Sequence, residues 1–286
     1  MFLAVVLGSY LHATLAQSVA PGAVDITKCW SYPSIDNPPL TIAVNDGLVF
    51  LGMSGAKLTA VSSSGAKLWS TDLGGAISSN LLPVGGSLLL VTSPIESNGA
   101  KAGRSVLRSL SKETGVTQWS IGLADAEQHF LLGSNGSVIV ASANGTVRAL
   151  DPAAGNTIWE REIASGIAAR PVNSGTLLLV PYASNQVLRI ALATGEIEST
   201  QQFSFGITAI AGLLNGEMIS GDERGNISSL KVGNEKPTWK FKSGGQISAL
   251  IPIGSNILAA SHDNFVYYLA ARTGNVVWKR RLGGRA

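Results

Sequence analysis

Tryptophan recurs along this chain at a nearly constant spacing. The six tryptophans lie at positions 30, 69, 119, 159, 239 and 278, so the steps between them are 39, 50, 40, 80 and 39 residues. The step of 80 equals two steps of 40, and Ser199 occupies the intermediate position in the same local frame. A period of about 40 residues is typical of solenoids, propellers and other arrays. The repeat therefore constrains the fold more strongly than any local motif.

Within each period the apolar pattern indicates strands. The clearest unit contains four short segments rich in β-forming residues, and Gly, Asn and Asp separate them: 247–253, 257–260, 265–269 and 276–279. Helical repeats of similar length would not tolerate the 33 glycines of this chain. The sequence therefore predicts an all-β protein, a β-propeller built from four-stranded antiparallel blades.

A glycine lies four residues before most of the repeated tryptophans. The unit Leu269-Ala-Ala-Arg-Thr-Gly-Asn-Val-Val-Trp278 shows the pattern most clearly. It resembles the Ala-x-Asp-x-x-Thr-Gly-x-x-x-Trp docking motif of pyrroloquinoline-quinone-like (PQQ-like) repeats. That family includes quinoprotein dehydrogenases and the lipoprotein of the outer-membrane β-barrel assembly machinery. The resemblance covers residues 25–286, which we predict to be one propeller domain.

The motif has a structural explanation. The glycine supplies a turn with positive φ between the third and fourth strands, and the tryptophan can lie flat against the neighbouring blade. Burial of about 200 Å² of ring surface contributes several kcal/mol per blade at about 25 cal/mol per Å². We therefore predict that the following residues dock the blades: Trp30, Gly65, Trp69, Gly115, Trp119, Gly155, Trp159, Trp239, Gly274 and Trp278.

Two units depart from the motif. In the fourth blade Ser199 replaces the tryptophan, although Gly195 keeps its place. In the fifth blade the glycine lies at position 233, and Pro237 precedes Trp239. We expect these two blades to dock less tightly than the others.

Trp30 predicts the outer strand of a blade, but the sequence before it does not contain the three inner strands of that blade. Six complete four-stranded units follow it, and the closing Leu282-Gly-Gly284 repeats Leu73-Gly-Gly75, which introduces an inner strand. The resemblance implies rings that commonly have eight blades. We therefore expect six complete blades plus an N-terminal outer strand, in a shortened seven- or eight-bladed ring with partial closure.

The resemblance leaves two classes of function open. One is a non-catalytic extracytoplasmic scaffold that binds other proteins, similar to the barrel-assembly lipoprotein. The other is an oxidoreductase of alcohols or sugars that holds PQQ over calcium, or a degenerate remnant of one. Only Cys29 is available as a thiol, no short stretch supplies several oxygen ligands for calcium, and His12, His129 and His262 lack metal-ligand spacing. We predict the scaffold, with no catalytic, cofactor-binding or metal-binding residues.

A protein-binding surface is expected on the loops between second and third strands, which share one face of a propeller with the connections between blades. The longest of these loops spans Ser93 to Arg104, and other blades present short charged tips there. The predicted contact residues are Glu96, Lys101, Arg104, Asp222, Arg224, His262 and Asp263. The alternative is that these are ordinary solvated hairpin tips.

The first 17 residues contain an apolar stretch and end in Thr14-Leu15-Ala16-Gln17, which approximates a secretory cleavage site. We therefore predict a signal peptide over residues 1–17 and a periplasmic or secreted protein without a transmembrane segment. The formal charge of +3 is scattered rather than clustered, so no nucleic-acid partner is expected. We expect a monomer whose partner is another protein.

Overall fold

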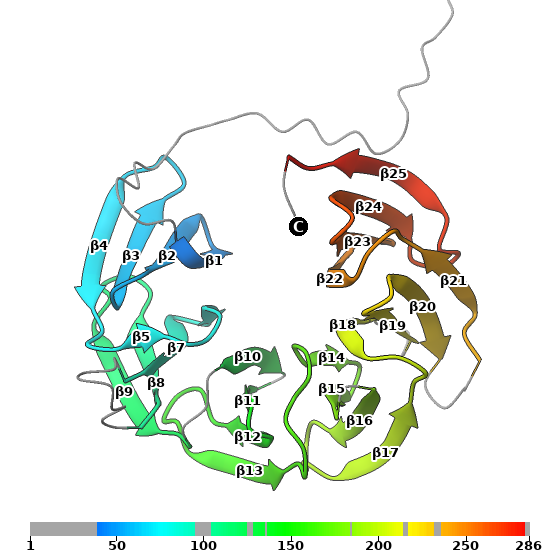
Figure 1. Ribbon diagram of the computed structural model, residues 1–286. Coiled ribbons are helices and arrows are strands. Elements are labelled where there is room, and N and C mark those ends of the chain that lie inside the picture. The colour runs from blue at the N-terminus through cyan, green and yellow to red at the C-terminus, as the bar shows by residue number, and fades with distance from the viewer. Residues whose placement is uncertain are drawn as a thin grey trace, which may run out of the picture.

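The computed structural model describes residues 39–94, 104–124, 128–134, 136–183, 185–213, 217–231 and 236–283. Within these residues the chain forms 25 strands and no helix. The strands make six separate antiparallel sheets that stand around a ring (Figure 1). The predicted propeller of six blades is confirmed.

Each sheet uses strands that are consecutive in the chain. The first sheet contains β1 (Pro39–Asn45), β2 (Leu48–Met53), β3 (Lys57–Ser62) and β4 (Lys67–Asp72). The second contains β5 (Ala76–Ile77), β6 (Leu82–Val84), β7 (Ser87–Ser93), β8 (Val106–Ser111) and β9 (Thr117–Gly122), with β5 and β6 both paired to β7. The third contains β10 (His129–Ser134), β11 (Ser137–Ser142), β12 (Thr146–Leu150) and β13 (Thr157–Glu162).

The remaining three sheets repeat this arrangement. The fourth contains β14 (Val172–Ser174), β15 (Leu177–Tyr182), β16 (Gln186–Ala191) and β17 (Ile197–Gln202). The fifth contains β18 (Ile207–Gly212), β19 (Glu217–Asp222), β20 (Asn226–Lys231) and β21 (Trp239–Lys242). The sixth contains β22 (Ile247–Ile253), β23 (Asn256–Ser261), β24 (Phe265–Ala270) and β25 (Val276–Arg281). In Figure 1 the strands β10, β14, β18 and β22 lie toward the centre of the ring, and β13, β17, β21 and β25 lie outside.

The core lies between neighbouring sheets rather than in one central mass. Middle strands such as β7 and β15 are covered on both faces, and their residues 88–91 and 178–180 are fully buried. Strands covered on both faces are expected to be continuously apolar. In the outer strand β13, by contrast, Trp159 is the one buried residue and the three charged residues 160–162 are exposed. This distribution explains why only 14% of the chain is charged, against about 25% in an average domain.

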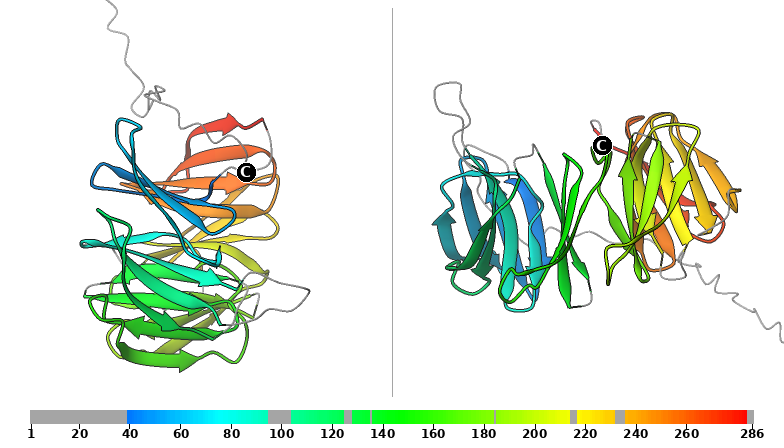
Figure 2. Two further views of the ribbon diagram at one scale, coloured as in Figure 1. Left: turned by 90° about the vertical axis from the view of Figure 1, so that its left-hand side faces the viewer. Right: turned by 90° about the horizontal axis from the view of Figure 1, so that it is seen from below.

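The hairpins gather on two opposite faces of the ring, seen from the side in Figure 2. On one face, the residue after each fourth strand donates its backbone N–H to the hairpin between the second and third strands of the same sheet. The N···O distances are 2.9 Å for Leu73–Ala56, 2.7 Å for Leu123–Ser105, 2.9 Å for Ile163–Gly145, 2.8 Å for Phe203–Asn185, 2.9 Å for Ser243–Gly225 and 2.8 Å for Leu282–Asn264. We call this the connector face. The opposite face, with the turns between third and fourth strands, is called the turn face.

The first and sixth sheets stand apart at the top of the ring (Figure 1), and among the described residues no sheet joins β1–β4 to β22–β25. The described part of the chain therefore forms an open ring. Trp30 and residues 1–17 lie outside the described residues, so the N-terminal outer strand and the signal peptide remain predictions.

Candidate functional site

Four indoles fix the relative positions of the sheets. Each indole ring packs against the motif glycine of the next sheet. A Cβ atom added to that glycine would come too close to the ring, at 2.6 Å for Gly115 and Trp69, 2.9 Å for Gly155 and Trp119, and 2.6 Å for Gly195 and Trp159. Gly274 and Trp239 make the same contact. Those glycines have φ between +71° and +75°. The glycine thus serves two purposes, because it forms its own turn and leaves room for the tryptophan of the preceding sheet.

The same indoles also bind the neighbouring sheet through their N–H groups. The Nε1 atoms donate to the carbonyl three residues before the glycine, over 2.9 Å to Lys112 O, 3.1 Å to Pro152 O, 2.9 Å to Leu192 O and 2.9 Å to Ala271 O. Docking is therefore directional as well as apolar. Gly65 forms the expected turn with φ of +88°, while Trp30 lies outside the described residues.

Trp278 belongs to the last strand and meets no following sheet among the described residues. Its ring instead stacks on Tyr268 of its own sheet, with ring centroids 5.1 Å apart. Trp278 is therefore partly exposed, whereas Trp159 between two sheets is 8% exposed. The motif predicted its position correctly, but the described residues show no docking partner for it.

The seam between the fourth and fifth sheets has no docking tryptophan. Ser199 pairs across the sheet with Arg189, where the third sheet pairs Trp159 with Ala149. Arg189 is 5% exposed and donates to Ser199 Oγ over 3.3 Å and to Gln201 Oε1. Burial lowers the pKa of the Arg189 guanidinium, and the charge of Glu198 partly offsets that effect. The looser docking expected at Ser199 thus falls on this seam.

The fifth sheet, by contrast, does not dock loosely on the sixth. Trp239 binds Gly274 and Ala271 like the other indoles, although Pro237 precedes it. The expectation for this blade was wrong, because Trp239 makes the same two contacts as the other docking indoles. The glycine at position 233 lies outside the described residues.

The predicted contact residues of the fifth sheet lie on the connector face. Asp222 is 8% exposed, and its carboxylate accepts hydrogen bonds from Arg224 N and Asn226 N, both over 2.9 Å, and from Asn226 Nδ2 over 2.7 Å. The Asp222 carboxylate therefore shapes the turn. The Arg224 side chain is exposed and its Cζ lies 4.1 Å from the centroid of the Phe205 ring.

The sixth sheet continues this surface with His262 and Asp263. The Asp263 carboxylate accepts from Tyr267 Oη over 2.6 Å, Gly244 N over 2.7 Å and Phe265 N over 3.0 Å. Burial alone would raise the pKa of Asp263, but these hydrogen bonds outweigh it and the pKa is lowered. Burial, together with the hydrogen bond and charge of Asp263, raises the pKa of Tyr267 to about 12.

The structure therefore brings together four of the seven predicted contact residues: Asp222, Arg224, His262 and Asp263. Hydrogen bonds through Ser243 link the two hairpins, because its hydroxyl contacts both Gly225 O and Ser261 Oγ. Arg104 is exposed on the connector face of the second sheet, across the ring from this group. Glu96 and Lys101 lie outside the described residues.

A central cavity of about 750 Å³ lies among the inner strands of the second to sixth sheets. Arg170 is the one charged side chain among the described residues that line it. Its side chain is exposed to the cavity, yet the surrounding sheets limit its hydration, and this desolvation lowers the pKa of the guanidinium.

This cavity does not suit a calcium-held quinone. Calcium requires several oxygen ligands that include carboxylates, and none of the described lining residues is Asp or Glu. Across the described part of the chain, no cluster of three or more His, Cys, Asp or Glu residues could hold a metal. The positive charge of Arg170 would also repel a divalent cation in this cavity.

Sequence reasoning missed a set of polar side chains that join the inner strands. Asn80 donates from Nδ2 to Leu131 O over 3.0 Å and accepts from Leu131 N over 2.9 Å. Asn173 Nδ2 donates to Gly133 O over 2.7 Å, and Thr208 Oγ1 donates to Ile247 O over 2.6 Å. An amide or hydroxyl group among apolar residues of an inner strand was the available signal.

Among the described residues, no helix has the length and apolar character needed to span a membrane.

Curated and solved proteins share this architecture. Outer membrane protein assembly factor BamB of Yersinia pestis is 22% identical over 254 residues, which are 77% of this chain and 62% of that protein. The BamB structure from Moraxella catarrhalis superimposes with a TM-score of 0.64 and 20% identity, covering 85% of this chain and 74% of that one. The structure of quinohemoprotein alcohol dehydrogenase from Comamonas testosteroni superimposes with a TM-score of 0.70 and 10% identity. The match covers 91% of this chain and 63% of that one.

The two structural likenesses establish the fold alone. Family membership comes from the family model described as outer membrane protein assembly factor BamB, which matches residues 22–166 and 103–285. The chain spans 62% of the length of its curated relative. Because the two matches together extend over nearly all of the repeats, the chain belongs to the BamB-type family of PQQ-like repeat β-propellers.

Proposed function

We propose that this protein is a non-catalytic scaffold that binds another protein outside the cytoplasm during the assembly of outer-membrane proteins. The observation that carries the proposal is the match of the family model from residue 22 to residue 285. A periplasmic or secreted location agrees with this role and with the apolar N-terminal sequence. The partner belongs to the assembly apparatus from which the family takes its description.

The proposed contact surface is the connector face of the fifth and sixth sheets, with Arg224 and His262 at its centre. Both residues lie in short hairpins that the Asp222 and Asp263 carboxylates hold in shape. Such tips on a rigid framework are suited to recognition, because little conformational entropy is lost on binding. Mixed positive and negative charge favours a partner segment that also carries both signs.

Site-specific photo-cross-linking in the native cell envelope tests this surface. A photoreactive phenylalanine analogue replaces Arg224 or His262, and a matched control replaces Arg272, an exposed residue on the turn face of the same sheet as His262. We expect one cross-linked protein from Arg224 and His262 and none from Arg272. Cross-links confined to Arg272 would contradict the proposed surface.

The oxidoreductase alternative has its own test. The purified protein is mixed with PQQ and calcium and assayed for dye-linked oxidation of alcohols and sugars, beside a known quinoprotein as positive control. We expect no activity, because the cavity lining described above has no carboxylate to hold calcium. Turnover that depends on both PQQ and calcium would contradict the scaffold.

A further inference from the structure

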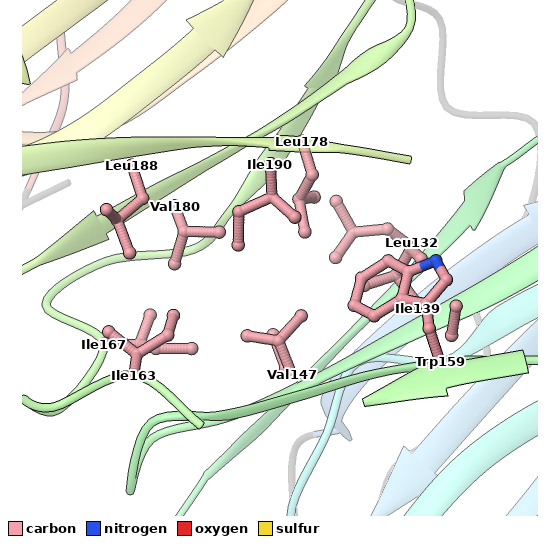
Figure 3. Close-up of a cluster of buried hydrophobic side chains, with 12 residues drawn as sticks. Leu132, Ile139, Val147, Trp159, Ile163, Ile167, Leu178, Val180, Leu188 and Ile190 are labelled. Atoms are coloured by element: carbon pink, nitrogen blue, oxygen red, sulfur yellow. The ribbon is translucent and has the colours of Figure 1, made fainter. Parts of the chain in front are cut away.

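The seam between the third and fourth sheets shows how this fold fills the space between two blades. Trp159 lies at one end of the cluster between the sheets, below Leu178 and Ile190 of the fourth sheet, and Val180 and Leu188 of that sheet lie farther along the cluster (Figure 3). On the other side Val147 and Ile163 close the cluster (Figure 3). The buried cluster of this seam consists of apolar side chains and one indole.

The next seam keeps the backbone but loses these side chains. Val180 pairs with Leu188 in the fourth sheet, and Ser220 pairs with Ser228 in the same register of the fifth. Ser199 takes the place of the indole. Leu230 remains apolar where the fourth sheet has Ile190. Three large apolar groups are thus replaced by hydroxymethyl groups across one seam.

A pocket of about 280 Å³ lies at this seam. Ser199 does not itself line it, but Leu230, the counterpart of the Ile190 that lies above Trp159, does. Its walls include Phe203, Ser220, Ser228, Leu230 and Pro237, and exposed Lys240 lies at its rim. Pockets for complete small-molecule ligands usually measure about 300–1,000 Å³. A volume below that range fits one large side chain better than a cofactor.

Arg189 is much larger than Ala149, which holds the equivalent position in the third sheet, but its side chain does not fill this pocket. Its guanidinium is held by Ser199 Oγ and by the side-chain oxygen of Gln201, which itself lines the pocket. The Nε atom of Arg189 is buried and has no hydrogen-bond partner among the described residues. The pocket therefore combines apolar walls with hydroxyl and amide groups.

The pocket also meets the connector face. Phe205 lines it, and the guanidinium of Arg224 lies over that ring. Asp222 and Asn226, which shape the Arg224 hairpin, line it as well. A segment bound at the connector face could therefore insert a side chain here without leaving the surface.

We propose that this pocket binds a tryptophan side chain from an extended segment of the partner protein. Four other seams of this protein hold an indole, and each gives its N–H a carbonyl acceptor. Among the described residues the fourth seam supplies no indole, and its pocket is lined by hydroxyl and amide side chains that can accept a hydrogen bond. Buried aromatic anchors of this kind dominate the affinity of many protein interfaces. The inference rests on the proposed scaffold function and names its recognition element.

Fluorine NMR tests the pocket on the full chain without the partner. The probe is N-acetyl-5-fluorotryptophanamide, and N-acetyl-leucinamide serves as the competitor that should not displace it. We expect saturable broadening with a Kd on the order of 1 mM, because a single small probe must offset the lost translational and rotational freedom with few contacts. The double variant R189A/S199W rebuilds the Ala149–Trp159 pair and fills the pocket, so its affinity should fall at least tenfold.

The control variant is Thr200→Trp, which adds an indole to the exposed, opposite face of the same strand and should bind the probe normally. Should R189A/S199W fail to fold, Ser228→Leu narrows the pocket from the other wall and should weaken binding. Absence of probe binding, or equal binding by the wild type and the filled variants, would overturn the pocket. Cross-linking from His262 that persists in that case would leave the scaffold function standing.

Discussion

At the scale of single residues, the motif glycines form the surface on which the preceding indole rests. A Cβ atom at Gly195 would lie 2.6 Å from the ring of Trp159, and the same residue has φ of +72°. Gly175 in the same sheet has φ of +61°, but a Cβ there would meet nothing within 4 Å. Comparing substitutions at these two glycines therefore distinguishes the cost of backbone strain alone from the added cost of displacing the indole.

We predict that Gly195→Ala lowers the free energy of unfolding by about 2–4 kcal/mol, because strain and displacement of the indole add. Gly175→Ala should lower it by only about 1 kcal/mol, from strain alone. Urea unfolding followed by circular dichroism measures both. Equal losses in the two variants would mean that Gly195 does not carry the indole.

The burial of Tyr267 and its hydrogen bond to Asp263 together predict a dependence of stability on alkaline pH. The pKa of Tyr267 is raised to about 12 in the folded protein, against about 10 when unfolded. Between these values the unfolded chain loses a proton that the folded protein keeps, so stability should decrease as pH rises from about 10 to about 12. Below pH 10 the contribution is complete.

Tyr267→Phe should remove this part of the pH dependence. We expect the slope of unfolding free energy against pH, between 10 and 11, to be flatter in Tyr267→Phe than in the wild type. Tyr268→Phe is the control, because Tyr268 bonds an amide group of Asn256 rather than a carboxylate. A slope that changes as much in the control as in Tyr267→Phe would exclude the assignment.

At the scale of the sheets, the sequence predicted the repeated parts well. The tryptophan spacing and the preceding glycines placed six sheets and four of the docking contacts. It did not reveal the pocket between the fourth and fifth sheets, because that requires Val180 and Leu188 to be compared with Ser220 and Ser228 on separate strands. It also left open whether Asp222 and Asp263 were contact groups, although carboxylates two residues before a backbone N–H commonly cap turns.

Sheets that dock on both sides should depend more strongly on their tryptophan than the last sheet does. Trp159→Ala removes an indole buried between two sheets and should cost about 3–5 kcal/mol. Trp278→Ala removes a ring that stacks on Tyr268 within one sheet and should cost less than about 2 kcal/mol. Urea unfolding measures both variants, and a larger loss for Trp278→Ala would contradict this ranking.

At the scale of the whole molecule, six sheets form an open ring with a connector face and a turn face. The sequence predicted that charged tips of different blades would form one patch on one face. Arg104 of the second sheet does lie on the connector face, but the ring separates it from Arg224 and His262, because these sheets lie on opposite sides (Figure 1). Distance around a ring cannot be read from a linear repeat without the number of blades and their order in space.

Hydrogen–deuterium exchange with the cross-linked partner tests the central claim, that the connector face of the fifth and sixth sheets binds another protein. The partner identified by the His262 cross-link is purified and added to the unmodified protein. The exchange of this protein with the partner is then compared with its exchange alone. We predict slower exchange at residues 223–225 and 262–264 and unchanged exchange at the turn-face residues 193–195 and 272–274 of the fourth and sixth sheets. Protection confined to the turn-face residues, with none in the two hairpins, would contradict the account.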